Sequence, residues 1–251
     1  MRRWLPLLLL AVLAVGLFVV SGRLRGLHYV PSSASGELVY AAAFSDESDD
    51  WSIYDDGRLS ARVADGALVV QTDQSSGAAY SAGPFQFGDV IVQARAQASD
   101  GPIDNGFGLM VGLRTQDNSR PDDDTYLLFL ISSDGYYSVR QRTGGVEQDL
   151  SAWIPSSAIQ TGLGAANELE VTVSDDQALF TVNGQPLQFC VPNAPGGMST
   201  FYQDDCVDGA MLDALAIGGV ATGQIGVVAL ATATGGPGVT VQFDDILVYG
   251  A

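Results

Sequence analysis

Few side chains in this chain of 251 residues could act as a general base or as a ligand for a soft metal ion. Its single histidine, His28, lies beside an N-terminal apolar run, and its only thiols are Cys190 and Cys206. A Ser–His–Asp or Cys–His centre uses a histidine as its base, and a structural zinc site uses about four His and Cys ligands. The composition therefore excludes both in the globular part. Carboxylates, tyrosines, arginines and serines remain for chemistry.

Carboxylates are abundant, because the chain carries 24 Asp and five Glu. Glu168 and Glu170 are expected on one face of a strand, where two solvated carboxylates are the favoured interpretation. A glycoside hydrolase that uses Asp residues from separate loops remains an alternative. We expect a protein without catalytic residues rather than an enzyme.

The charge balance restricts the partners. Eleven basic residues, all Arg, stand against 29 acidic ones, which gives a net charge of −18. Neutralising phosphates needs a basic surface, so a nucleic-acid partner is excluded.

Arginines and aromatic residues point instead to a binding surface. The segment 106–114 reads as a strand with Phe107, Leu109, Val111 and Leu113 on one face. The opposite face carries three glycines and Arg114, which predicts a shallow groove floor; the alternative is that a loop or side chain of the same domain lies there. The predicted ligand-binding residues are Arg114, Phe129, Arg140, Tyr126 and Trp153. Arginine suits hydroxyl pairs or carboxylates, so an acidic sugar is a reasonable ligand.

The elements that must position these residues are short strands separated by turn dipeptides. Asp65-Gly66, Asp134-Gly135 and Asn183-Gly184 each predict a two-residue hairpin turn. Such a turn at Asn183-Gly184 pairs Phe180 with Leu187, and one at Asp134-Gly135 pairs Phe129 with Arg140. About a dozen strands with almost no helical periodicity predict an all-β fold, a two-sheet antiparallel jelly-roll sandwich over residues 37–251.

The two cysteines enclose a segment rich in Pro, Gly and Asp. A Cys190–Cys206 disulfide would stabilise the folded state by about 3 kcal/mol in the chain-entropy model, and such a bond persists outside the cytosol. Two unrelated buried thiols are the alternative.

The N-terminus carries a candidate membrane segment. Residues 4–20 are apolar throughout, with Arg2 and Arg3 before them and Arg23 and Arg25 after them. This predicts one transmembrane helix, a signal anchor within residues 1–25, followed by a linker over residues 26–36; a cleaved signal peptide is the alternative. With the disulfide, the pattern predicts a single-pass protein of the cell membrane with its domain outside the cytoplasm.

Several segments resemble a known family. The segments that carry this resemblance are Phe44–Trp51, Asp65–Val70, Gly106–Arg114, Tyr126–Tyr137, Asn167–Val171, Val182–Gly184, Gly223–Val227 and Phe243–Val248. They are similar to concanavalin A-like jelly-roll domains, closest to the 3-keto-disaccharide-hydrolase-like and laminin-G-like branch. The resemblance implies a concave sheet that binds or cleaves glycans. Retaining laminarinase-like relatives carry Glu-x-Asp-x-x-Glu or Glu-x-Asp-x-Glu on one strand, and this chain has no such motif. We therefore expect a non-catalytic module that binds a glycan or a protein; an accessory subunit of a membrane complex is the alternative.

The resemblance also implies one structural Ca²⁺ where the first and last long strands meet. Asp46, Asp49 or Asp50 would combine with Asp244 or Asp245 and with backbone carbonyls to give the six to eight oxygens that Ca²⁺ prefers. Ordinary turn and bulge chemistry is the alternative for these aspartates.

Overall fold

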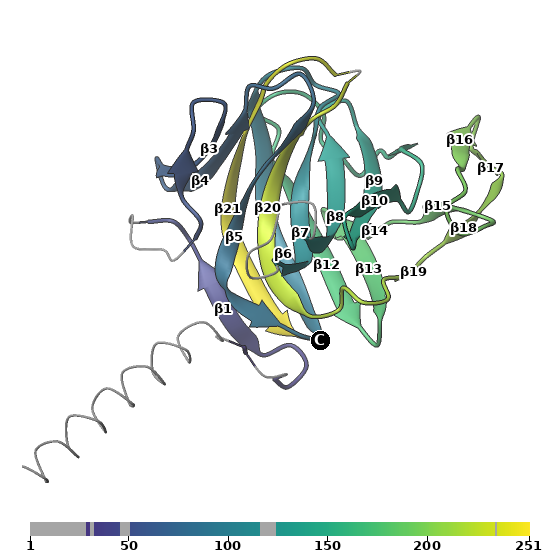
Figure 1. The fold of residues 1–251 in the computed structure, drawn as a ribbon, viewed down its shortest axis with the longest axis horizontal. Coiled ribbons are helices and arrows are strands. Elements are labelled where there is room, and N and C mark those ends of the chain that lie inside the picture. Colours follow the sequence, from purple (N-terminus) through teal and green to yellow (C-terminus); the bar gives the residue numbers. More distant parts are fainter. Residues whose placement is uncertain (1–28, 31–32, 46–50, 116–123, 234) are drawn as a thin grey trace, which may run out of the picture.

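The computed structural model describes residues 29–30, 33–45, 51–115, 124–233 and 235–251 (Figure 1). Within these ranges the protein is built from β-strands and turns, without a helix. The predicted transmembrane segment, residues 4–20, lies outside the described residues, and among the described residues there is no helix with the length and apolar character needed to cross a membrane.

Two antiparallel sheets form a sandwich, as predicted. One has ten strands, and eight of them follow one another in the order β14 (Gln185–Pro186), β13 (Gln177–Val182), β12 (Asn167–Ser174), β6 (Val90–Asp100), β21 (Val239–Gly250), β4 (Ala67–Thr72), β3 (Leu59–Ala64) and β2 (Tyr54–Asp55). The other two, β1 (Leu38–Ala42) and β19 (Leu215–Ala216), pair with β21 and β13. The first and the last strand of the described chain therefore lie side by side.

The second sheet has seven strands. Six of them run in the order β10 (Val146–Asp149), β9 (Tyr136–Thr143), β8 (Thr125–Ser132), β7 (Gly106–Arg114), β20 (Gly223–Ala231) and β5 (Gly77–Phe87), and β11 (Ile154–Pro155) pairs with β9. Alternate residues of both sheets pack into one core between them, and its largest fully buried side chains include six phenylalanines: Phe44, Phe107, Phe129, Phe180, Phe189 and Phe243.

A small lobe projects from one end of the sandwich, at the right of Figure 1. It consists of two short ribbons, β15 (Phe189–Pro192) with β18 (Gly209–Leu212) and β16 (Thr200–Tyr202) with β17 (Asp205–Val207). The predicted disulfide is present in this lobe, with a Cα–Cα distance of 5.4 Å between Cys190 and Cys206. We call residues 189–212 the disulfide lobe.

Two of the three predicted hairpin turns have the expected backbone. Asp65 and Gly66 both adopt positive φ, as do Asn183 and Gly184, which is what a type I′ turn requires. The Asn183-Gly184 turn gives the expected register: the Leu187 amide donates to the Phe180 carbonyl at 3.0 Å, and both side chains are buried.

The third turn differs from the prediction. Gly135 has φ of 97°, but Asp134 is not in the positive-φ region, so the loop has three residues with glycine at its left-handed position. The register between β8 and β9 therefore moves by one residue: Phe129 pairs with Val139, and Arg140 pairs with Leu128. Because successive strand residues face opposite sides, this shift places Phe129 in the core, where its ring lies 5.1 Å from that of Phe180. The expectation that Phe129 faces a ligand beside Arg140 is wrong.

Candidate functional site

The face of the seven-stranded sheet that points away from the sandwich core carries a second apolar cluster. Its buried members come from neighbouring strands and include Met110, Leu128, Leu130 and Val228, and Tyr126 and Trp153 pack against them half-buried. The centre of this face is therefore filled by side chains. It is not the open floor predicted from the glycines.

The glycines of β7 serve close packing within the domain, which was the alternative considered from the sequence. A Cβ on Gly108 would collide with the carbonyl oxygen of Phe129, and one on Gly112 would collide with that of Val220. Gly112 has φ of 66° and lies in a register shift between Val111 and Arg114. This bulge turns Leu113 into the second cluster instead of the core, contrary to the alternation expected for β7.

Arg114 lies exposed at the end of β7, beyond this bulge. It does not line either of the two hollows beside Trp153. The predicted combination of Arg114, Phe129 and Arg140 on one surface is therefore not formed, since Phe129 is buried and Arg114 lies apart.

Arg140 faces the outer side and is already paired. Its Nε lies 2.8 Å from Asp149 Oδ1, and its Nη1 lies 3.5 Å from Glu147 Oε1. Both acids come from the edge strand β10, which pairs with β9. The Tyr126 hydroxyl donates to Glu147 Oε2 at 3.5 Å, and burial, followed by the Glu147 charge, raises the pKa of Tyr126. The positive charge of Arg140 is therefore largely balanced within the protein.

Trp153 is a half-buried aromatic side chain of this face. Its Cη2 atom would lie 3.4 Å from a Cβ on Gly106, so the indole lies directly over that glycine. The segment before it is fixed by hydrogen bonds: the Ser151 hydroxyl accepts from the Val139 amide at 3.2 Å, and the Ala152 amide donates to the Cys190 carbonyl at 3.2 Å. The sheet and the disulfide lobe together hold Trp153 in place.

A hollow lies on each side of Trp153. One, of about 340 Å³, is lined by Asp104, Ser132, Asp134, Tyr136, Arg140, Trp153, Thr232 and Ala233. The other, of about 350 Å³, is lined by Asp149, Ser151, Ala152, Trp153, Pro192, Gly197, Met198, Ser199, Thr200 and Phe201. We call Trp153 with these two hollows the Trp153 site. It brings together Arg140 and Trp153 from the predicted set.

Several residues of the Trp153 site lie outside the five predicted ligand-binding residues. Tyr136 follows the Asp134-Gly135 turn and exposes 39% of its surface at the first hollow. The disulfide lobe supplies Met198 and Phe201 to the second hollow. The turn dipeptide itself indicates that its neighbours lie at a sheet end, whereas the position of the lobe depends on long-range packing.

The carboxylates of the Trp153 site stand on loops and on the edge strand. Asp104, Asp134 and Asp149 line the hollows, whereas the outward positions of β7, β8 and β20 hold residues such as Met110, Leu128 and Val228. In the described part of the chain, these central strands therefore present no carboxylate on the outer face. Glu168 and Glu170 belong to β12 of the opposite sheet, and Glu170 accepts a hydrogen bond from Gln93 Nε2 at 2.7 Å.

The predicted Ca²⁺ ligands are only partly described. Asp46, Asp49 and Asp50 lie outside the described residues, and Asp244 and Asp245 lie on β21. Among the residues with a described position, no group of three or more His, Cys, Asp or Glu side chains could hold a metal ion.

No protein-family model matches the chain, and no curated protein matches it. Solved structures resemble it in fold. A protein of unknown function with a galectin-like fold from Bacillus subtilis is 14% identical over 86% of this chain and 97% of that one, with a TM-score of 0.56. The catalytic domain of an endo-1,3-beta-glucanase (laminarinase) from Thermotoga petrophila is 15% identical over 85% and 97%, with a TM-score of 0.52. A non-specific endo-beta-1,3(4)-glucanase of glycoside hydrolase family 16 is 12% identical over 90% and 95%, with a TM-score of 0.52. These likenesses show that the chain has a concanavalin A-like jelly-roll fold.

Proposed function

We propose that the protein is a non-catalytic binding module for a neutral glycan, which it holds along the Trp153 site. The observation that carries this proposal is the fixed indole of Trp153 between two hollows with polar linings. An aromatic face packs on the apolar face of a sugar ring, and a few polar groups around it fix the orientation. Two solved structures of this fold are named as endo-glucanases, which supports a glycan as the ligand class.

The charges favour a neutral sugar over the acidic sugar expected from the sequence. Three carboxylates, Asp104, Asp134 and Asp149, line the two hollows, against the single cation of Arg140. Because Arg140 already pairs with Asp149 and Glu147, an anionic ligand would have to displace one of these acids. Hydroxyl groups, by contrast, can donate to the carboxylates as they stand.

Binding of soluble laminarin oligosaccharides to the full-length protein tests the proposal. Trp153→Ala should lower the affinity about tenfold, which corresponds to about 1.4 kcal/mol and is typical of a lost aromatic contact. Arg114→Ala serves as the matched control and should leave the affinity unchanged. A loss of binding in Arg114→Ala with none in Trp153→Ala would move the site to the end of β7. Release of reducing sugar by the wild-type protein would favour the glycoside hydrolase alternative.

A protein ligand is the second candidate, and the disulfide lobe favours it. Met198 and Tyr202 expose 89% and 64% of their surfaces there and are available for contact with a partner. If the chain is an accessory subunit of a membrane complex, Met198→Ser with Tyr202→Ser should release it from its partners during purification in mild detergent. Glycan binding to the first hollow should persist in that variant.

We propose further that residues 4–20 anchor the chain in the cell membrane by a single pass, with the sandwich outside the cytoplasm. The Cys190–Cys206 disulfide supports this location, because such bonds persist in oxidising compartments. Protease added to intact cells should digest the sandwich while a cytoplasmic control protein survives. Complete protection of the sandwich would contradict the proposed orientation.

A further inference from the structure

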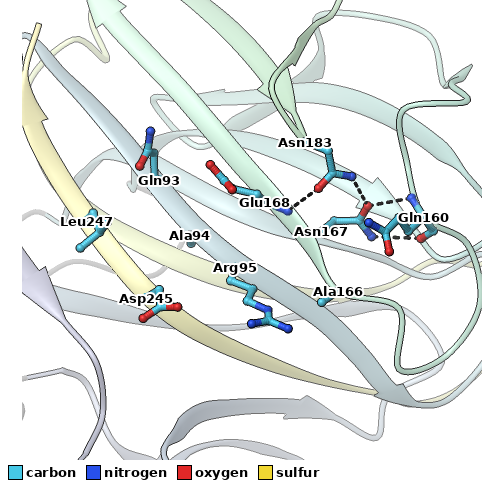
Figure 2. Close-up of a pocket in the computed structure, with 10 residues that line it drawn as sticks. All are labelled: Gln93, Ala94, Arg95, Gln160, Ala166, Asn167, Glu168, Asn183, Asp245 and Leu247. Atoms are coloured by element: carbon cyan, nitrogen blue, oxygen red, sulfur yellow. Dashed lines mark hydrogen bonds between the residues drawn. The ribbon is translucent and has the colours of Figure 1, made fainter.

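A hollow of about 530 Å³ lies on the outer face of the ten-stranded sheet, on the side of the sandwich opposite the Trp153 site. It extends over β12, β6 and β21 (Figure 2). Its lining combines one cation, Arg95, with the carboxylates of Glu168 and Asp245, and Leu247 adds an apolar surface. It is larger than either hollow beside Trp153, and the proposed glycan site does not use it.

A β-bulge in β21 places one of these carboxylates. Phe243 and Ile246 both point into the core, so the strand fits two outward residues, Asp244 and Asp245, between them. Asp245 has φ of 50°, in the left-handed region that residues other than glycine seldom adopt. Bulges often redirect a side chain next to a binding site, and unusual backbone conformations cluster at such sites. The backbone here is arranged so that the exposed Asp245 carboxylate lies at the hollow.

Arg95 lies between acids without pairing with them. Its Cα partners are Asp244 on one neighbouring strand and Glu168 on the other. Even so, no ion pair or hydrogen bond joins the Arg95 guanidinium to another described residue. In Figure 2, its guanidinium and the carboxylates of Glu168 and Asp245 are spread around the hollow, with no interaction drawn between them. Both signs of charge are therefore available to a ligand.

The rim next to Glu168 is rigid. Asn183 accepts a hydrogen bond from the Glu168 amide at 2.9 Å and donates to Asn167 Oδ1 at 2.8 Å. Asn167 in turn accepts from the Gln160 amide at 2.8 Å and donates to the Gln160 carbonyl at 3.0 Å (Figure 2). This network fixes the backbone of the strand end that carries Glu168.

The chemistry of the lining selects one ligand class. A simple anion would bind Arg95 but be repelled by the two flanking carboxylates, and a simple cation would face Arg95. A neutral sugar would find no aromatic side chain in the lining. We infer that this hollow binds a small zwitterion, either a free amino acid or the two ends of a short peptide. Its carboxylate is held by the Arg95 fork, and its ammonium group by the Asp245 carboxylate.

Chemical-shift titration of the ¹⁵N-labelled full-length protein at low ionic strength, with EDTA present to remove divalent metals, tests this inference. L-Alanine should give saturable shifts at the amides of Arg95, Glu168 and Asp245, and acetate and methylammonium should bind at least tenfold more weakly. Alanyl-alanine, whose charges are further apart, distinguishes the two sources: tighter binding than L-alanine indicates a short peptide, and weaker binding a free amino acid.

Two variants locate the site. Arg95→Gln and Asp245→Asn should each lower the L-alanine affinity at least tenfold; both residues are exposed, and asparagine tolerates positive φ, so the fold should persist. Arg62→Gln, which alters an exposed arginine of the same sheet outside the hollow, should change nothing. Absence of saturable shifts, equal binding of acetate, or an equal effect of Arg62→Gln would overturn the inference. None of these results depends on glycan binding at Trp153.

Discussion

The indole of Trp153 lies over Gly106, with its Cη2 atom 3.4 Å from the place where a Cβ would stand. Gly106 belongs to β7, in the middle of the seven-stranded sheet, whereas Trp153 precedes the short strand β11. The glycine therefore lowers the sheet surface enough for the indole to lie close to it. This contact sets the height of the indole above the sheet and the shape of the two hollows beside it.

Enlarging residue 106 should therefore displace the indole. Gly106→Ala adds a Cβ at ordinary contact distances from Trp153 and Leu230 and should bind glycan nearly as well as wild type. Gly106→Val adds two further carbon atoms, and we expect at least a tenfold loss of glycan affinity with a small change in melting temperature. Calorimetry and thermal unfolding of both variants provide the measurement. Wild-type affinity in Gly106→Val would show that the position of Trp153 does not matter for binding.

The long edge strand β5 is covered by a tyrosine. The Tyr54 hydroxyl donates to the Tyr80 carbonyl at 3.0 Å and accepts from the Tyr80 amide at 3.2 Å. It thus occupies backbone groups that an edge strand would otherwise offer to another chain. Tyr54→Phe should lower the free energy of unfolding by about 1–3 kcal/mol, measured in urea, and should increase aggregation.

Tyr136→Phe is the matched control for this edge. Its ring is also partly exposed, and its hydroxyl makes no hydrogen bond with a described residue. We expect unfolding in urea and aggregation to match wild type. Equal destabilisation of the two variants would mean that the loss of any tyrosine hydroxyl, rather than the cover of β5, causes the effect.

The sequence predicts those parts of the fold that depend on local chemistry. Asp65-Gly66 and Asn183-Gly184 determine their turns because both residues of each pair adopt positive φ. At Asp134-Gly135 the same residue types form a three-residue loop. There the Ser132 hydroxyl also accepts a hydrogen bond from the Tyr136 amide at 3.3 Å. A dipeptide alone does not distinguish these loops. The resulting shift by one residue was enough to bury Phe129.

The remaining differences come from packing between distant segments. The bulge at Gly112 depends on the carbonyl of Val220, which approaches where a side chain would be. Strand β5 contains Gly83 and Pro84 and so lacks the usual strand pattern. It forms by pairing with β20, and its place at the edge of the sheet tolerates the proline. The second hollow beside Trp153 needs the disulfide lobe, whose placement is not encoded by local periodicity.

Alkaline pH should destabilise the protein through Tyr137. Burial raises the pKa of this phenol to about 12, even though its hydroxyl donates a hydrogen bond to the Gln188 carbonyl. The folded state thus holds the proton more tightly than the unfolded chain, whose tyrosines titrate near pH 10. The stabilisation from the neutral phenol is complete below about pH 10 and is lost as the pH rises toward 12.

Urea unfolding at pH 8 and at pH 11 measures this loss. Tyr137→Phe should be less stable than wild type at pH 8 and should lose less stability on going to pH 11. Some decline should remain, because burial also raises the pKa of Tyr54, Tyr80 and Tyr126. The same pH dependence in both proteins would mean that Tyr137 does not control the alkaline transition.

Loss of the disulfide should affect both the Trp153 site and the stability of the protein. The bond joins residues 16 apart, and a loop of this length contributes about 3 kcal/mol in the chain-entropy model. The Cys190 carbonyl also accepts a hydrogen bond from the amide of Ala152, the residue before Trp153. Cys206→Ser should therefore weaken glycan binding several-fold and lower the melting temperature by several degrees. Unchanged binding would mean that the lobe does not shape the site.

The Ca²⁺ proposal depends on the junction of the chain ends. Strand β1 pairs Ala42 with Ile246, directly beside the bulge that turns Asp244 and Asp245 outward. Asp46 follows Ala42 by four residues, and four residues span at most about 14 Å. Asp46, Asp49 and Asp50 lie outside the described residues and are assigned to this site from the sequence alone. They would add the oxygen ligands that the two carboxylates of β21 lack by themselves.

Thermal unfolding with buffered free Ca²⁺ tests this site. Millimolar Ca²⁺ should raise the melting temperature by several degrees, and EDTA should reverse the change, since an ion that binds only the folded state stabilises it by mass action. Asp244→Asn combined with Asp46→Asn should remove the response. Asp65→Asn, an aspartate in a turn elsewhere on the sheet, should keep it. A melting temperature that does not respond to Ca²⁺ or EDTA would leave the aspartates as turn and bulge residues, because a bound ion must shift the unfolding equilibrium.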